Sequence, residues 1–373
     1  MLSVGNAGAP RQGLKDGTIR DLRHITDRVT RRVGGSRSTR HRWRSLGRRD
    51  QGPQRPTTND HDLRQVPGAT MRCRMKGPMF MFMIAGELGN SAERPHPRLI
   101  IVGVDDSAEA AAAARWAVRE ADLRGDDLLL VHAYEVPLMP QQGMAAAIAQ
   151  GRQECQALLD KVAGTLAIPP RMHLDQLIEM DSPESLLPRL SEKAELMVLG
   201  QDHRVLSGQM PLGHTANTVA SLSPHPVVAV PRGWTSPAGD RRPIAVAIDG
   251  QHSSASTLSF AFTEASLRQV PILVVHSAPL SELAAGEQDA RLNLAEILAG
   301  WKADHPDIVV ETLLLAGPPR DTVASVSADA QLLVVGSPFR GRHWTRWIRS
   351  VARSVLERAT CPIAVIPQQH PAQ

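Results

Sequence analysis

Three glycines lie in a loop that has the chemistry to bind an anion. The stretch VLGQDHRVLSGQMPLGHTAN, residues 198–217, begins as an apolar run, passes Gly200, Gly208 and Gly213, and resumes as a predicted helix near Thr215. Backbone N–H groups in such a loop and at a helix start are unpaired donors, and the helix dipole adds a positive field. Glycine also serves ordinary turns because it accepts a positive φ, so a simple strand-to-helix turn is the alternative.

A carboxylate follows the first apolar run of the globular region. The run LIIVGVDDS begins at Leu99, passes Gly103, and ends in Asp105 and Asp106. Because ligands of parallel sheets bind at the carboxyl ends of the strands, Asp105 and the Gly200 loop are expected to face one site. No nucleophile elbow, paired metal ligands or Walker-type lysine accompanies them, which favours ligand recognition over catalysis.

The same pattern occurs twice along the chain. Five residues of the first copy recur 144 positions later, namely Asp105 and Asp249, Glu120 and Glu264, Leu123 and Leu267, Arg124 and Arg268, and His132 and His276. Later landmarks recur 136 positions on, namely Gly200 and Gly336, Arg204 and Arg340, Pro226 and Pro362, and Pro231 and Pro367. The second copy is therefore eight residues shorter between its second and fourth strands.

Each copy alternates Val/Ile/Leu-rich runs such as ELMVLG and PVVAV with helical segments. Near-continuous apolar strands separated by helices are typical of a parallel sheet covered on both faces. The predicted fold is α/β, with two tandem, doubly wound, five-stranded Rossmann-like domains. We expect a disordered Arg-rich extension over 1–95, domains over 96–232 and 243–368, a linker over 233–242 and a tail over 369–373.

The basic charge is concentrated in the N-terminal segment. Residues 1–78 hold 18 Arg and Lys against 6 Asp and Glu, a net charge of +12, so the remainder carries −8. Clustered arginines can neutralise phosphates, and one interpretation is therefore an arm that binds nucleic acid or an anionic surface. We favour the alternative, an unstructured extension without selected function, with Met79, Met81 or Met83 as the real start. Nucleic-acid binding is expected only through this segment.

Cysteine use and hydropathy bear on the compartment. Cys73, Cys155 and Cys361 form no CxxC motif and are too scattered for a disulfide scaffold or a zinc site, which favours a reducing, cytoplasmic setting. No apolar run approaches the length that spans a bilayer, and the run PMFMFMIAG at 78–86 is too short. No membrane association is expected.

Several of these features together resemble a known family. A first strand ending in VGVDDS, a fourth ending in VLG, a glycine-containing loop and a final strand after PHPVVAVP resemble a universal stress protein domain. Residues 96–370 resemble two such domains in tandem. The resemblance implies that the first-strand Asp contacts adenine. It also implies that a loop of pattern Gly-x-x-Gly-x9-Gly-Ser/Thr holds the ribose and phosphates of ATP, alone or with Mg²⁺, whereas members without the motif bind none.

The first copy matches this loop pattern in part. Gly200 and Gly213 occupy two of the glycine positions, whereas His203 occupies the third. His214 stands at the Ser/Thr position, with Thr215 one residue later. A histidine has a Cβ that hinders close approach to a phosphate, although its ring can donate a hydrogen bond. Neither histidine has companions at a metal-site spacing, so no metal site is predicted.

The second copy departs further from the pattern. It keeps Asp249, Gly336 and Ser350 but has Phe339 and Arg349 at the other glycine positions. Nucleotide binding is therefore expected mainly in the first copy.

The segment 344–355 has two faces at helical spacing. Apolar residues lie on one face and arginines on the other, namely Trp344, Trp347, Ile348, Val351 and Val355, and Arg342, Arg346, Arg349 and Arg353. The favoured interpretation is a core or subunit contact opposite a solvated face. A helix that binds an anion or a membrane surface is the alternative.

These observations leave three functional hypotheses. The first is a stress-response regulator that binds ATP or a related adenine nucleotide with little or no catalysis. The second is an adenine-nucleotide-dependent enzyme, either a slow ATPase or a transferase. The third is a nucleotide-free interaction protein with decayed sites. We also expect the final strands PVVAVP and PIAVIP to pair within the chain, because each would otherwise be an exposed edge, and a homodimer is an additional hypothesis.

Overall fold

The computed structural model describes residues 98–135, 144–201, 214–237, 239–249, 254–337 and 348–368, except for the side chains of residues 214 and 348–350. The expected disordered extension over 1–95 and the tail over 369–373 lie outside these residues. So do His203, Gly213 and the two tryptophans of the segment 344–355.

The first half of the described chain alternates strands with helices. In order, its elements are β1 (Leu99–Gly103), α3 (Ala108–Arg124), β2 (Asp127–Tyr134), α4 (Met144–Ala163), β3 (Leu174–Met180), α5 (Pro183–Ser191), β4 (Leu196–Gln201), α6 (His214–Leu222) and β5 (Val227–Pro231). The Ala-rich α3 begins after Ser107, whose hydroxyl accepts a hydrogen bond from Ala110 N, and ends at Gly125 with a positive φ of 74°.

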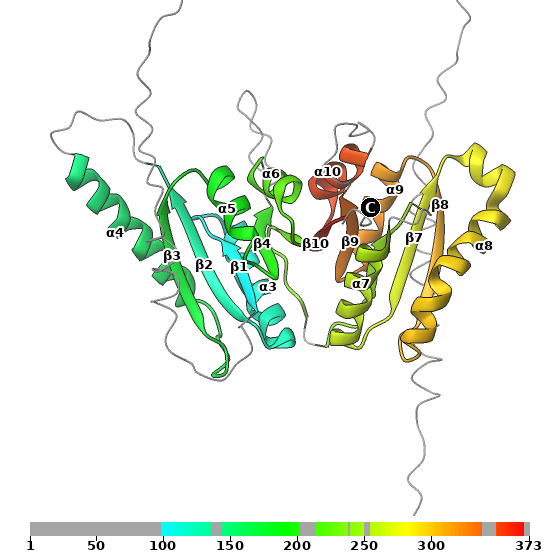
Figure 1. Ribbon diagram of the computed structural model, residues 1–373, viewed down its shortest axis with the longest axis horizontal. Helices are drawn as coiled ribbons and strands as arrows, with labels where there is room; N and C mark the ends of the chain where they lie inside the picture. The colour runs from blue at the N-terminus through cyan, green and yellow to red at the C-terminus, as the bar shows by residue number, and fades with distance from the viewer. Residues whose placement is uncertain are drawn as a thin grey trace, which may run out of the picture. The chain divides into compact units, whose positions relative to one another are not determined.

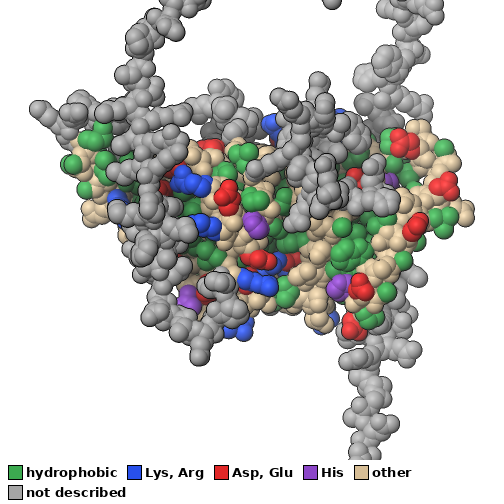
Figure 2. Space-filling view, viewed as in Figure 1, with side chains coloured by type: hydrophobic (Ala, Val, Ile, Leu, Met, Phe, Trp, Pro, Cys, Tyr) green, Lys and Arg blue, Asp and Glu red, His purple; other side chains and the backbone are tan. Residues whose placement is uncertain are grey.

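The second half repeats this order. Its elements are β6 (Ile244–Ala247), α7 (Ala255–Arg268), β7 (Ile272–Ala278), α8 (Leu280–Asp304), β8 (Val310–Ala316), α9 (Pro319–Val326), the short 3-10 helix η2 (Ser327–Asp329), β9 (Leu332–Ser337), α10 (Ile348–Arg358) and β10 (Ile363–Pro367). The residue that ends α7 in the left-handed conformation is Gln269, at the position equivalent to Gly125. Acidic side chains are spread along α8 (Figure 2), in keeping with the negative net charge outside the N-terminal segment.

The ten strands form one sheet in the order β3-β2-β1-β4-β5-β10-β9-β6-β7-β8 (Figure 1). Strands within each half are parallel. The direction in which the chain adds strands reverses between β1 and β4, and again between β6 and β9. The predicted α/β fold of two five-stranded, doubly wound halves is confirmed.

Both faces of the sheet are covered by helices. Alternate residues of a strand point to opposite faces, so Ile100 and Val102 pack in one core cluster, together with residues of α3, α4, α7 and α8. Ile101 packs in the other cluster, with residues of α5, α6, α9 and α10. Val355 of α10 is fully buried and Val351 packs against this second cluster, as the apolar face of the segment 344–355 predicted.

The two halves meet at β5 and β10. These strands pair antiparallel, with Ala364 opposite Val228 and Ile363 opposite Ala229. All five residues of β5 are buried. The expected pairing of the two final strands is therefore observed.

A buried cluster of four charges joins α3 to α7 beside this junction. Arg124 pairs with Glu120 on its own helix and with Glu264 on α7. Arg268 makes the reciprocal pairs with Glu264 and Glu120. The carboxylate side chains are at most 1% exposed and the guanidinium groups 10%. Two of the residue types that recur 144 positions apart, Glu120/Glu264 and Arg124/Arg268, thus form reciprocal ion pairs across an approximate two-fold axis.

The charges in this cluster shift one another's pKa values. Burial would lower the pKa of Arg124 and of Arg268, but the neighbouring carboxylates outweigh burial and raise both. Burial would raise the pKa of Glu120, but Arg268 and Arg124 lower it. Burial and the charge of Glu120 raise the pKa of Glu264 to about 7. Both arginines are therefore held charged in the interior.

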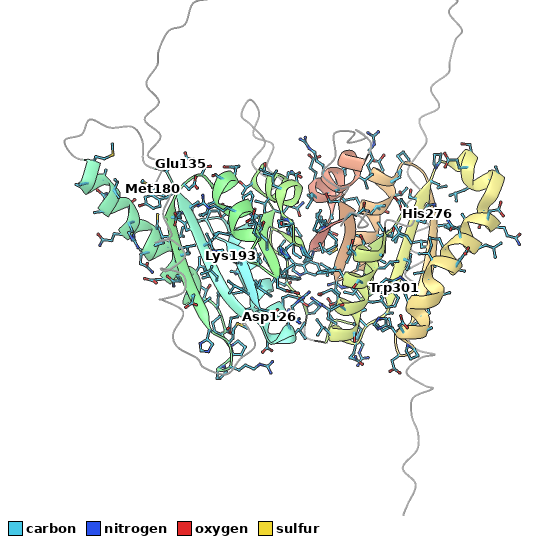
Figure 3. All side chains as sticks on the ribbon, viewed as in Figure 1. Asp126, Glu135, Met180, Lys193, His276 and Trp301 are labelled. Carbon is cyan, nitrogen blue, oxygen red and sulfur yellow. The ribbon has the colours of Figure 1, made fainter. Side chains whose placement is uncertain are left out.

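Asp126 is a buried carboxyl group at the end of α3 (Figure 3). The residue is 5% exposed, and its Oδ2 has no hydrogen-bond partner among the residues that the structure describes. Burial raises its pKa from 3.8 to about 6, in spite of the nearby charge of Arg124. The equivalent residue of the second half is Val270, also 5% exposed, so an apolar side chain fits at this place in the repeat.

We expect the variant Arg124→Met to lose about 3 to 5 kcal/mol of unfolding free energy, because it leaves two buried carboxylates short of one counter-charge. Urea unfolding monitored by circular dichroism measures the loss. The control is Arg291→Met, which breaks an exposed pair with Glu287 and should cost less than about 1 kcal/mol. Equal small losses in both variants would contradict this role for the cluster.

We expect Asp126→Val to raise the unfolding free energy at pH 8 by about 2 kcal/mol, in proportion to the raised pKa of Asp126. Because the folded pKa is the higher one, the native protein bears a penalty above pH of about 6 that disappears as the pH falls toward 4. The gain should therefore shrink in urea titrations at pH 4. Asp122→Asn, at an exposed carboxylate, is the control and should change stability by less than about 0.5 kcal/mol. A gain that does not vary with pH would argue against burial of the charge as its cause.

Candidate functional site

A cavity lies at the carboxyl edge of the first half, where the strand order reverses between β1 and β4. Its volume is about 190 Å³. Its walls come from the turn after β1, the start of α3, the end of β2, residues 199 and 200 of β4, the first half of α5 and the start of α6. This is where doubly wound sheets bind their ligands. Of the predicted site residues, Gly103, Asp105, Gly200 and Thr215 lie together in its wall.

The turn after β1 holds Asp105 in a defined position. Asp105 Oδ1 accepts hydrogen bonds from Ser107 N, at 3.0 Å, and from the Ser107 hydroxyl. The same hydroxyl accepts from Ala110 N at 3.0 Å and so caps α3. The Asp105 side chain is exposed, and the second carboxylate oxygen has no partner among the described residues. That oxygen can accept a hydrogen bond from a ligand.

His132 braces the same turn from β2. Its Nδ1 donates to Val104 O at 2.7 Å, which leaves Nε2 as an acceptor in the cavity wall. His276 donates to Ile248 O at 3.1 Å in the second half. The sequence shows these two histidines as equivalent positions but carries no signal for the contact itself, because the carbonyl lies 28 residues away.

Gly200 is required by the approach of α3 to β4. A Cβ at this position would lie 2.6 Å from Ala110 N and from the carbonyl carbon of Glu109. No side chain can be accommodated there without moving the backbone of the helix. The glycine of the predicted anion loop therefore has a packing role, whatever the loop binds.

Thr215 stands in the cavity wall at the start of α6. Its hydroxyl donates to Glu184 Oε1 of α5 at 2.9 Å. His214 is the first residue of α6, but its side chain is outside the described residues, as are His203 and Gly213.

Glu109 is a wall residue that sequence reasoning missed. It is 4% exposed, and within the described part of the chain its Oε1 has no hydrogen-bond partner. The signal was available, because Glu109 falls at helical spacing with the buried residues Ala113, Trp116 and Glu120 of α3.

In the second half, Asp249 follows β6 as Asp105 follows β1. The Ser254 hydroxyl donates to Asp249 Oδ1 at 3.4 Å. A Cβ at Gly336 would lie 3.0 Å from Thr257 Oγ1, so this glycine also faces the first turns of a helix. The side chain of Ser350 and the neighbouring loops over 250–253 and 338–347 are outside the described residues.

Metal, membrane and thiol chemistry are three further possibilities for the described residues. No cluster of three or more His, Cys, Asp or Glu side chains there could hold a metal ion. The described helices include none with the length and hydropathy to cross a membrane. Cys155 and Cys361 are buried free thiols, and burial raises the pKa of Cys361 to about 12, which disfavours the reactive thiolate.

Comparisons with known proteins give one family for both halves. The model of the universal stress protein family matches residues 97–231 and 240–367. A universal stress protein of Mycobacterium tuberculosis is 32% identical over 296 residues, which cover 71% of this chain and 95% of that protein. A universal stress protein structure from Archaeoglobus fulgidus has the same fold, with a TM-score of 0.55 and 15% identity over 73% of this chain and 98% of that one. Another from Archaeoglobus fulgidus, in complex with dAMP, is 29% identical and covers 34% of this chain and 98% of its own, with a TM-score of 0.27.

We expect Gly200→Ala to destabilise the protein by about 1 to 3 kcal/mol, because the added methyl group collides with the backbone of α3. Thermal unfolding followed by circular dichroism measures the change. Gly300→Ala is the matched control, since Gly300 lies within α8 with no atom within 4 Å of the added Cβ, and it should be neutral or stabilising. The same sign of change in both variants would rule out the close approach as the cause.

Proposed function

The chain belongs to the universal stress protein family, and we propose that its first domain binds ATP or a related adenine nucleotide. In this proposal the protein is a regulator in a stress response, with little or no catalysis. The observation that carries it is the cavity at the strand reversal, where Asp105, Gly200 and Thr215 come from three separate segments.

Each wall residue has a role in this proposal. The family resemblance implies that Asp105 contacts adenine, and in this proposal its free oxygen accepts a hydrogen bond from the adenine amino group. His132 Nε2 accepts a hydrogen bond from a ligand hydroxyl or amino group. The start of α6 lies in the cavity wall, where its backbone N–H groups suit the phosphate end of a nucleotide.

The first domain is the better candidate because of the loop residues. It keeps Gly200 and Gly213, whereas the second domain has Phe339 and Arg349 at positions where the family pattern has glycine. Side chains at those positions hinder the approach of backbone N–H groups to a phosphate. The second domain keeps Asp249, which alone supports only weak binding.

The proposal places the protein in the cytoplasm, where free thiols persist. Little or no catalysis is proposed because no hydroxyl of the described wall is hydrogen-bonded to a histidine. The Ser107 hydroxyl donates to Asp105 and caps α3, and the Thr215 hydroxyl donates to Glu184. Steady multiple turnover of labelled ATP would favour the enzyme hypothesis instead. Failure of any adenine compound to bind would favour a nucleotide-free interaction protein.

We expect Asp105→Ala to weaken adenine-nucleotide binding by about ten- to a hundredfold, because it removes a charge-assisted hydrogen bond worth about 1.5 to 3 kcal/mol. Isothermal titration calorimetry with ATP and, in parallel, AMP measures the loss.

The matched control is Asp249→Ala, the equivalent change in the second domain, which should leave the affinity within about twofold. The reverse pattern would place the working site in the second domain. Undiminished binding in both variants would remove both of these sites from consideration.

A further inference from the structure

The wall of the first-domain cavity is acidic. Asp105 and Glu109 line it directly, and Glu184 binds the Thr215 hydroxyl that lines it. None of the described lining residues is a lysine or arginine. We propose that this pocket selects adenine ligands that bring little negative charge, a nucleoside or a nucleoside monophosphate, in preference to ATP. This inference rests on the proposed function of the same site and narrows its ligand class.

Glu109 is the most strongly placed of these carboxylates. Its Oε1 is buried and has no hydrogen-bond partner in the described ranges, where the cation paired with it is Arg232, whose Nε lies 3.6 Å away. That distance permits an ion pair but not a hydrogen bond. The Arg232 side chain is half exposed, so solvent screens its charge, whereas Glu109 acts through the protein interior. The field of Glu109 in the cavity is therefore only partly cancelled.

Glu184 lies beside the cavity, next to the lining residue Pro183, and is hydrogen-bonded to the lining residue Thr215. It lies in the first turn of α5, where the helix dipole stabilises a carboxylate. Glu184 accepts the hydrogen bond of the Thr215 hydroxyl at the start of α6. That hydroxyl is therefore not available to donate to a phosphate oxygen. A polyphosphate in this part of the cavity must therefore compete with a resident anion.

The second half has the opposite charge at the corresponding place. The positions of Pro183 and Glu184 correspond, 136 residues later, to Pro319 and Arg320, the first two residues of α9. Both helices begin with proline, but the second residue is negatively charged in α5 and positively charged in α9. The fold therefore does not require an acidic residue here, and Glu184 is a feature of the first site alone.

Electrostatic repulsion supplies the selectivity. Two charges in a protein environment at separations of several ångströms interact strongly enough to change an equilibrium by tenfold or more. ATP brings several negative charges to the carboxylates, AMP about two and adenosine none. The penalty should therefore grow with each added phosphate.

Calorimetry of the full chain with adenosine, AMP and ATP tests this order, in EDTA and again with Mg²⁺. We expect wild-type protein to bind adenosine and AMP at least about tenfold more tightly than ATP, with or without Mg²⁺. The variant that combines Glu109→Gln and Glu184→Gln keeps the side-chain shapes, and glutamine can still accept from Thr215. We expect it to raise ATP affinity about tenfold and to change adenosine affinity less than about twofold.

The control is Glu192→Gln, which removes one charge at the far end of α5 and should leave all three affinities unchanged. Thermal unfolding of each variant, including the single variant Glu184→Gln, shows whether it folds as the wild type does. A change in affinity without a change in unfolding is then an effect of charge.

Tighter binding of ATP than of AMP by the wild type, or an equal gain for all three ligands in the double variant, would overturn the inference and leave the adenine site in place. Binding of none of the three would overturn the proposed function and the inference with it.

Discussion

The antiparallel pairing of β5 with β10 is the constraint on which both halves depend. Each strand is an apolar run whose side chains are buried, and unpaired it would expose a row of backbone donors and acceptors. Pairing within the chain satisfies these groups and makes ten strands one sheet. The same pairing brings α3 against α7, so the side chains on their facing surfaces must be compatible with burial.

The four-charge cluster meets this requirement, because each buried charge on α3 is paired with an opposite charge on α7. Buried ion pairs add little net stability over apolar residues of the same size, because desolvation offsets their attraction. However, any arrangement that leaves one of these buried charges unpaired is strongly destabilised. Since Arg124 needs Glu264 and Arg268 needs Glu120, the cluster tolerates one relative placement of the helices. A sheet junction of small apolar residues such as Val228 and Ala364 would specify its register less strictly.

Much of this fold could be predicted because apolar runs and a constant offset are local or repetitive signals. The strand ends, the doubling and the meeting of Asp105 with Gly200 follow from them. Contacts between distant segments could not be predicted in the same way. The offset shows that Glu120 and Glu264 are equivalent but not that they share arginines. Nor does any periodicity show that Gly200 packs on the backbone of α3, or that Thr215 binds Glu184, 31 residues away.

The covalent fusion of the two halves has an evolutionary consequence. In a dimer of identical chains every substitution appears twice, so an unfavourable change is doubled and the two sites must stay alike. Here one gene product carries Asp126 opposite Val270 and Glu184 opposite Arg320 at equivalent places. The four-charge cluster is reciprocal between the halves, whereas Asp126 beside it and Glu184 beside the cavity have no acidic counterpart in the second half. With both halves on one chain, one site can change its electrostatic character by substitution without altering the other, an independence that no homodimer can have.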